Sequence, residues 1–166
     1  MPSTYTPIST TLLSTSSASV TFSSIPQTYT DLILITDCIG DNASFPQIRL
    51  NSDTGTNYSY TSFRGQSGSF TASRGSNQSW LYITGSGVYS TTSYQLGNVV
   101  FFNNYSSTTQ YKTALSRDNS YQGTPSIDYV CATWRNNSAI STINIVPGNG
   151  NFSAGSMFTL YGIKAA

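Results

Sequence analysis

The sequence predicts an all-β protein built as a single β-sandwich domain, and three features of its composition indicate this fold class. Charged residues make up only 8% of the 166 residues, and neither Glu nor His occurs. Ser, Thr, Asn, Gly and Tyr replace the strong helix formers, while Thr, Tyr, Val and Ile favour a pleated sheet. Aromatic residues reach 13% at a formal net charge of +1, which distinguishes the chain from a disordered polymer.

The first half of the chain contains four expected strands. Val20, Phe22 and Ile25 alternate with polar residues, which is typical of a half-buried strand, whereas the continuous apolar run 32–35 indicates a central strand covered on both faces. Ile48 and Leu50 alternate around Arg49, and the turn-forming residues 51–57 separate this strand from the next one, at residues 58–63.

The second half contains five more expected strands, with Gly, Asn and Ser between them. The stretch 65–78 is rich in Ser and Gly and is expected to be a long surface loop or a weak edge strand. No window shows a helical period with caps, so we expect about eight to ten strands in two antiparallel sheets. The later expected strands are residues 80–83, 99–102, 129–134, 140–145 and 157–163.

Charge and hydropathy exclude several classes of partner. Seven Lys and Arg residues are scattered along the chain, which argues against a nucleic-acid interface or binding to an anionic membrane surface. No apolar run approaches the roughly 18 residues that a membrane span requires. Residues 1–11 have neither a basic start nor an apolar core, so we expect no secretory signal and synthesis in a reducing cytosol.

The inventory of reactive side chains does not favour an enzyme. Without His there is no ordinary catalytic triad and no imidazole ligand for a metal, and without Glu any acid–base pair must come from Asp residues. A polysaccharide depolymerase would need two carboxylates at a suitable separation. We therefore expect no enzymatic activity, no cofactor and no metal.

Two Asp-containing segments match functional motifs in part. Asp53-Thr54-Gly55 has the tripeptide of aspartic proteases, but Asn51 and Ser52 precede it instead of an apolar strand, so a hairpin turn is the favoured interpretation. Asp37, Asp41 and Asn42 contain the oxygen ligands that Ca²⁺ prefers, but their spacing matches no dedicated calcium loop and favours a solvated turn.

The Cys and Trp residues leave two alternatives open. Cys38 and Cys131 are expected to be free buried thiols, because a cytosolic origin argues against a bridge between them, although such a bridge remains the alternative. Trp80 and Trp134 are interpreted as core residues, with a role as platforms for sugar binding as the alternative.

Two stretches near the ends of the chain resemble small structural proteins of bacteriophages, especially those of marine and cyanobacterial podophages. The stretches are residues 22–32 (FSSIPQTYTDL) and 150–164 (GNFSAGSMFTLYGIK), about a sixth of the chain. The resemblance implies a virion, capsid-decoration or tail-fibre component with a jelly-roll sandwich that associates as a homotrimer. It includes no catalytic residue.

Composition and resemblance together predict a non-enzymatic virion surface protein, made in the host cytoplasm, that serves adhesion or particle stabilisation. Its expected partners are further copies of itself and other virion proteins of the capsid or fibre. The alternative is a receptor-binding fibre tip that recognises a host surface glycan. The exposed Tyr, Asn and Ser of the loops suit that role, because this mixture supplies rigid contacts and adaptable hydrogen bonds.

The chain is expected to divide into an N-terminal attachment segment, residues 1–17, and the sandwich domain, residues 18–166. Recognition is expected on the loops 65–78, 89–94 and 103–111, because loops at the ends of a sandwich vary without affecting the sheets. The predicted binding contacts on or beside these loops are Arg64, Arg74, Tyr89 and Tyr105.

Overall fold

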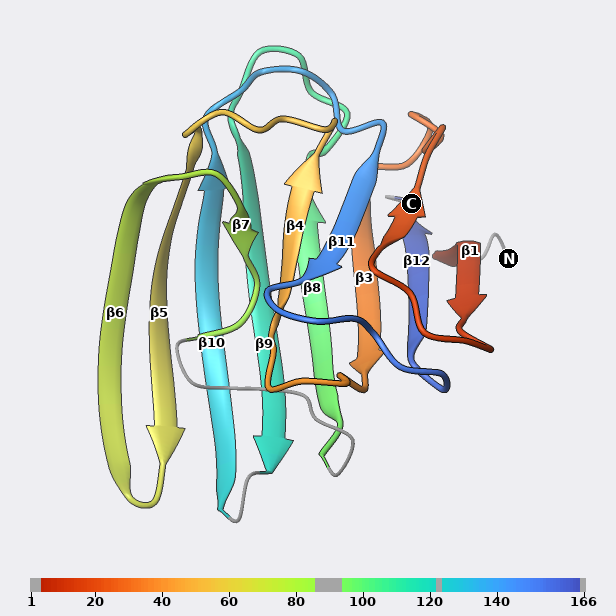
Figure 1. Ribbon diagram of the computed structural model, residues 1–166. Helices are drawn as coiled ribbons and strands as arrows, with labels where there is room; N and C mark the ends of the chain where they lie inside the picture. The colour runs from red at the N-terminus through yellow and green to blue at the C-terminus, as the bar shows by residue number, and fades with distance from the viewer. Residues whose placement is uncertain (1–3, 86–93, 122–123, 165–166) are drawn as a thin grey trace.

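The computed structural model describes residues 4–85, 94–121 and 124–164, which form twelve strands and no helix (Figure 1). The strands are β1 (Tyr5–Leu12), β2 (Val20–Phe22), β3 (Asp31–Cys38), β4 (Pro46–Leu50), β5 (Tyr58–Gln66), β6 (Ser69–Gln78), β7 (Leu81–Tyr82), β8 (Leu96–Asn103), β9 (Lys112–Tyr121), β10 (Pro125–Trp134), β11 (Ile143–Pro147) and β12 (Met157–Ile163).

The strands form two sheets that face each other. The large sheet has the order β1-β12-β3-β8-β9-β10-β5-β6, and the small sheet has the order β2-β11-β4-β7. All neighbouring strands are antiparallel. In Figure 1 the small sheet lies in front of the middle of the large one. The predicted all-β sandwich of two antiparallel sheets is confirmed.

The core lies between the sheets, because each strand turns alternate side chains toward it. In β9 and β10 buried and exposed positions alternate along almost the whole strand. The largest buried side chain, Trp134, stacks with Tyr58 at a ring-centroid distance of 6.4 Å. Phe102, Leu34 and Ile48 extend the same cluster across both sheets.

The N-terminal segment belongs to the sandwich. Residues 5–12 form β1, which pairs along its length with β12 at one edge of the large sheet. Ile8 and Leu13 pack against the core. The structure therefore places part of the expected attachment segment, residues 1–17, within the fold, and its role in attachment stays a prediction.

The stretch 65–78 forms the end of β5 and most of β6, so of the two expected alternatives the edge strand is correct. The chain turns at Ser67 and Gly68, where φ is 52° and 76°. A β-hairpin turn of this kind requires positive φ, which Gly adopts without steric cost. The Ser/Gly-rich composition reflects this turn and a strand that is exposed along most of its length.

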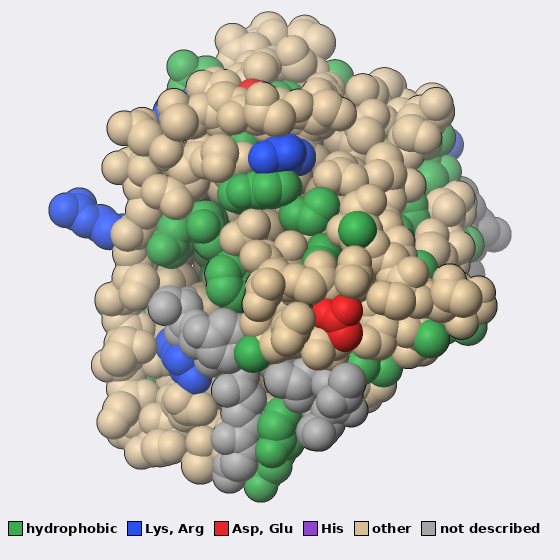
Figure 2. Space-filling view, in the orientation of Figure 1, with side chains coloured by type: hydrophobic (Ala, Val, Ile, Leu, Met, Phe, Trp, Pro, Cys, Tyr) green, Lys and Arg blue, Asp and Glu red, His purple; other side chains and the backbone are tan. Residues whose placement is uncertain are grey.

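The face of the large sheet that points away from the core is apolar and uncovered by the rest of the described chain; we call it the outer face. Its side chains include Phe63, Phe101, Leu115, Ile127 and Tyr129, which are between 37% and 59% exposed. The opposite side of the molecule, formed by the small sheet, is mostly polar with small apolar patches (Figure 2). The two sides of the sandwich therefore differ sharply in their chemistry.

The loop between β4 and β5 is organised by Asp53, which confirms the turn interpretation of Asp53-Thr54-Gly55. Its carboxylate accepts hydrogen bonds from Gly55 N (2.8 Å), Asn57 Nδ2 (2.9 Å) and Trp134 Nε1 (2.7 Å). Burial raises the pKa of Asp53, but the hydrogen bonds from Trp134, Asn57 and Gly55 outweigh it, so the pKa lies below its usual value. The carboxylate thus has a structural role in fixing Trp134.

Replacing Asp53 with Ala is expected to lower the free energy of unfolding by about 2–4 kcal/mol, because it leaves the indole N–H of a buried Trp without an acceptor. Urea denaturation followed by Trp fluorescence measures the loss. Asp41→Ala is the matched control: Asp41 is an exposed turn carboxylate with two hydrogen bonds from Asn151, and its removal should cost less. Equal losses for the two variants would contradict the role assigned to Asp53.

Candidate functional site

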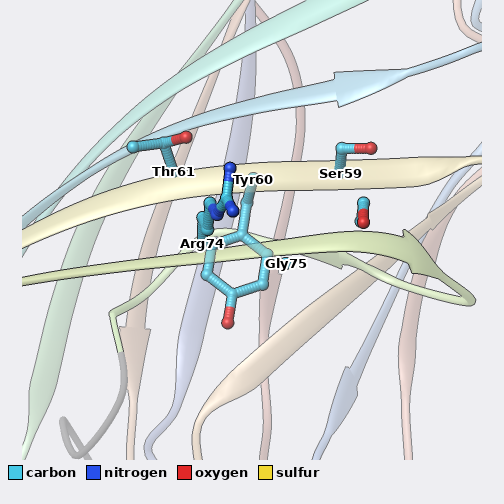
Figure 3. A pocket seen from close by; sticks show the side chains of 6 residues that line it. Ser59, Tyr60, Thr61, Arg74 and Gly75 are labelled. Carbon is cyan, nitrogen blue, oxygen red and sulfur yellow. The ribbon is translucent and has the colours of Figure 1, made fainter.

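A polar hollow lies at the hairpin of β5 and β6, and its volume is about 370 Å³ (Figure 3). Gly75 contributes no side chain to it, and a Cβ atom there would lie 2.5 Å from the ring of Tyr60. In Figure 3, Ser59 and Thr61 project to one side of β5 and the ring of Tyr60 projects to the other. The residues that line the hollow are Ser59, Tyr60, Thr61, Arg74, Gly75 and Ser76.

A second hollow of about 200 Å³ adjoins the first across β5, because it shares Ser59, Tyr60 and Thr61 and adds Cys131 and Thr133. Together the two hollows present several hydroxyl groups, which both donate and accept hydrogen bonds. The guanidinium of Arg74 adds a fork of donors that matches a carboxylate. This arrangement suits a ligand rich in hydroxyl groups that also carries an anionic group.

Of the three predicted binding residues that the structure describes, only Arg74 lines this hollow. Tyr105 is fully buried and its hydroxyl donates to the carbonyl oxygen of Pro26, so the prediction of a surface contact was wrong for this residue. The loop 103–111 folds back onto the core there, and Ile140 N donates to the carbonyl oxygen of Tyr105 at 2.9 Å. Tyr89 lies outside the described residues.

Arg64 lies on the inner side of β5, where it is half-buried and lines a small open hollow of about 120 Å³ with Gln66, Ser69 and Thr71, so its role as a binding contact stays a prediction. Its Nη2 donates to Oε1 of Gln66 at 2.6 Å. In the strand register Arg64 pairs with Asp128 of β10, which is fully buried. Arg64 therefore forms the partly exposed end of a buried polar cluster on β5, which is a strand and not a loop.

This cluster is a row of polar side chains that crosses the buried face of the large sheet, and the sequence analysis missed it. Four of its members are at most 2% exposed. The row occupies successive paired positions on β3, β8, β9, β10 and β5, namely Thr36, Asn98, Asp118, Asp128 and Arg64.

The segment that follows β7 is tied to this row. Asn98 Nδ2 donates to the carbonyl oxygen of Ile83 at 2.8 Å, and Ser116 Oγ lies 2.5 Å from the same oxygen. These contacts bring Gly85 against Asp128, where a Cβ atom would lie 1.7 Å from a carboxylate oxygen. Only Gly fits at this position.

Asp118 and Asp128 face each other directly across β9 and β10. None of their carboxylate oxygens has a hydrogen-bond partner among the described residues. Burial and then the charge of Asp128 raise the pKa of Asp118 to about 8. Burial raises the pKa of Asp128 to about 6, with Arg64 acting in the opposite direction. At neutral pH the pair therefore holds a proton, because two adjacent carboxylates disfavour ionising together.

Glycoside hydrolases use a protonated carboxyl group and an ionised one for catalysis, but both groups must reach the scissile bond. Asp118 and Asp128 are 1% and 0% exposed, and Gly85 lies against Asp128. A sugar ring has no access to the pair in this conformation. We therefore treat the pair as a structural cluster whose protonation affects stability.

Asp41 and Asn42 lie in a bend between β3 and β4, as interpreted from the sequence, whereas Asp37 lies within β3 and not in a turn. Asp41 accepts hydrogen bonds from Asn151 N at 2.8 Å and from Asn151 Nδ2 at 3.0 Å. These bonds hold the pKa of Asp41 below its usual value. In the described part of the chain, no three His, Cys, Asp or Glu side chains gather as metal ligands would.

Both Cys residues are free, as the sequence analysis expected, but only one is buried. Burial raises the pKa of the Cys38 thiol to about 12. Cys131 is exposed on the outer face, so the expectation of burial was wrong for this residue. Trp134 lies in the core, whereas Trp80 packs under the guanidinium of Arg49 at 3.5 Å from its ring centroid.

Comparisons with protein-family models, with curated proteins and with solved structures gave no match to this chain. The described residues include no helix long and apolar enough to cross a membrane.

The Asp118–Asp128 pair should make the protein less stable as the pH rises. The folded-state pKa values lie above the unfolded value of about 3.9, so the stabilising contribution is present below that pH. It is lost as the pH rises through about 6 and then about 8. We expect the free energy of unfolding to fall by roughly 2–5 kcal/mol from pH 5 to pH 9.

Urea denaturation at a series of pH values measures this slope. Asp118→Asn removes one of the two charges and should flatten the slope and stabilise the protein at pH 9. Asp41→Asn is the control and should leave the slope above pH 5 unchanged, because the pKa of Asp41 is lowered. A wild-type profile that is flat from pH 5 to pH 9 would contradict the raised pKa values.

Proposed function

We propose that this protein is a non-enzymatic structural component of the surface of a bacteriophage particle, where it decorates the capsid or forms part of a fibre. Its function would be adhesion or stabilisation of the particle, in association with further copies of the chain and with other virion proteins. The observation that carries this proposal is the uncovered apolar outer face of the large sheet.

An apolar face of this breadth indicates assembly. Soluble monomers rarely expose contiguous apolar patches larger than a few hundred Å², and larger ones mark interaction sites. The outer face contains Phe63, Phe101, Leu115 and Tyr129, which are the kinds of residue that interface centres favour. A protein that functions as part of a larger structure has a physical reason for such a face.

The strand order supports a jelly roll, the architecture that the resemblance implies. When β1, β12 and the hairpin β8–β9 are set aside, the sheets read β2-β11-β4-β7 and β3-β10-β5-β6. In these shortened orders the first strand lies next to the last, and the second strand would lie next to the one before the last, as in a jelly roll of eight strands. We infer a jelly roll in which the hairpin β8–β9 is inserted between β3 and β10.

Jelly rolls form many viral capsid domains and lectins. Because one fold serves many functions, this likeness supports the proposal only as an analogy. It does agree with both interpretations of the sequence, the virion surface protein and the glycan-binding tip.

The two stretches that resemble phage proteins lie side by side in the structure. Asp31 and Leu32 at the end of the first stretch pair with Ile163 and Gly162 of the second, and Thr30 N donates to the carbonyl oxygen of Ile163 at 2.7 Å. The ring of Tyr29 lies so close to Gly162 that a Cβ atom there would be 2.3 Å from it. The two stretches are therefore in contact where the first ends and the second ends, and Gly162 is required there by the neighbouring ring.

Attachment to the particle is proposed for the N-terminal segment, residues 1–17. β1 within this segment is an edge strand of the large sheet, with β12 on one side only. An edge strand presents unpaired backbone groups that can pair with a strand of another chain. This edge is one route by which another virion protein would hold the sandwich.

Locating the chain in purified particles tests the proposal. Mass spectrometry should find the protein in particles purified through a density gradient, and a particle reconstruction should show the sandwich on the outside of the capsid or fibre. Its absence from purified particles, in a preparation where the major capsid protein is detected, would overturn the proposed function.

The alternative function, recognition of a host surface glycan, is favoured by the hollow around Arg74. A volume of about 370 Å³ lies within the range typical of small-molecule sites. The hydroxyls of Ser59 and Thr61 and the guanidinium of Arg74 would bind the hydroxyl groups and a carboxylate of an acidic sugar.

Arg74→Ala should weaken binding to acidic glycans by about ten-fold or more, since a hydrogen bond to a charged group contributes about 1.5–3 kcal/mol. Arg74→Lys keeps the charge but not the fork of donors, and should retain part of the affinity. A glycan array followed by calorimetry measures both. Identical binding by the wild type and Arg74→Ala would exclude this hollow as the site.

A further inference from the structure

The outer face has a regular arrangement that follows from the strand register. One row runs through Ile35, Val99, Arg117, Tyr129 and Phe63, which are paired across β3, β8, β9, β10 and β5. The side chains of this row stand on the same side of the sheet, because residues paired across a sheet share a face. The row is apolar or aromatic at every position except Arg117.

A neighbouring row runs through Ile33, Phe101, Leu115, Cys131 and Thr61 in the same register. Phe101, Leu115 and Tyr129, together with Ser116 and Arg117, enclose a shallow hollow of about 190 Å³ between the two rows. Most of its lining is apolar, and it lies at the centre of the face. A surface of this relief accommodates side chains from a second apolar sheet.

The charges on the central part of this face are few and of opposite sign. They are Arg117 on β9 and, at the two ends of β3, Asp37 and Asp31, of which Asp31 already accepts a hydrogen bond from Asn104 N at 2.7 Å. In the register, Asp37 shares a row with Gly97 of β8 and Asn119 of β9. Arg117 lies two residues before Asn119 on β9. Asp37 and Arg117 are therefore one row apart along the strands and lie on either side of β8. Within the described residues, neither the Arg117 side chain nor the Asp37 side chain forms a hydrogen bond or an ion pair.

The size of the face is sufficient for a stable contact between proteins. With strands ~4.8 Å apart and a rise of ~3.4 Å per residue, the region from β12 to β5 covers roughly 600 Å² in projection. A standard interface buries about 800 Å² of accessible surface on each partner. Side chains that stand out of the sheet have more accessible area than the projection, so the outer face approaches this value.

We propose that the outer face packs against the outer face of a second copy of this chain, related by a two-fold axis that lies along β8. This axis places β9 of each copy over β3 of the other. The long side chain of Arg117 then reaches across the offset of one row to Asp37 of the second copy, and the symmetry makes this ion pair twice. The apolar rows on both sides of β8 are buried in the same step.

The contact is a sheet-on-sheet packing like the one inside the sandwich, with the two faces about 10 Å apart. It is isologous, since the same surface is used by both copies, and such an interface closes at two copies. The proposed contact gives two copies, whereas three are expected from the sequence. The inference rests on the proposed role in assembly but does not depend on the kind of particle.

Cys131 is a native probe of this interface. It is an exposed free thiol on the outer face, next to Leu115 in the register, whereas Cys38 is fully buried in the core. Packing of the second copy would cover Cys131. Its reaction with a thiol reagent should therefore be slow in the dimer and fast in any variant that dissociates.

The first test uses size-exclusion chromatography with light scattering on the full chain at micromolar concentration. The wild type should have twice the 17.9 kDa mass of the chain. Tyr129→Lys places a charge at the centre of the face and should give a monomer with a reactive Cys131 and an unchanged far-ultraviolet spectrum. Tyr111→Lys is the matched control, because Tyr111 is at least as exposed as Tyr129 (58% against 48%) but lies in the loop before β9, and it should leave the dimer intact.

The second test is a charge exchange. Arg117→Asp and Asp37→Arg should each weaken the dimer by at least ten-fold, because each creates two like-charge contacts, and the double variant should restore most of the affinity. A wild-type monomer or trimer, a dimer that persists in Tyr129→Lys, or a double variant no better than the single ones would overturn the proposal. Absence of the protein from particles would overturn the proposed function while leaving the dimer unaffected.

Discussion

The unequal width of the two sheets determines most of this structure. The small sheet has four strands and the large sheet has eight, so the small sheet covers only the middle of the large one. Strands β3, β8, β9 and β10 in the middle have fully buried inner faces, whereas β1 and β6 at the two edges are largely exposed on both faces. The positions of the core, the polar hollow and the outer face all follow from this difference in width between the two sheets.

The buried polar row lies on the part of the large sheet that is covered by the segment after β7 and no longer by β7 itself. Apolar side chains fill the core beneath β2, β11 and β4, but Asn98 and Ser116 use hydrogen bonds to the carbonyl oxygen of Ile83 to hold this segment down. The carboxyl groups of Asp118 and Asp128 are buried in the same region without such partners. Buried polar groups of this kind cost stability, and protonation reduces that cost because a neutral carboxyl group is easier to bury than a carboxylate.

The fold class could be predicted from the sequence because it depends on composition and on alternation, which are local properties. The expected strands around Leu34, Ile48, Phe102 and Trp134 exist, since each contains an apolar segment with turn residues beside it. β9 was missed because its buried positions are Lys112, Ala114, Ser116, Asp118 and Ser120, which carry little hydrophobicity. Its alternation is visible only once its neighbours in the sheet are known.

The candidate site could be predicted less well, because it depends on contacts between distant strands. Arg74 was identified from loop composition and does line the hollow, although its segment is a strand. Tyr105 lies in a loop that is polar in sequence, and nothing local shows that the ring enters the core. Asp118 and Asp128 become a pair only through the register of β9 and β10, which no single segment of the sequence contains.

The outer face also gives a physical reason for the unusual composition. A central strand that is covered on both faces has no exposed side on which Lys or Glu would be favourable. In the proposed dimer, the middle of the large sheet would be covered in this way, by the small sheet on one face and by the second copy on the other. Arg117 and Asp37 are then the charges that this layer tolerates, because each is neutralised by the other copy. In the proposed dimer the largest flat surface of the chain would be covered, which would account for part of the low content of charged residues, 8%.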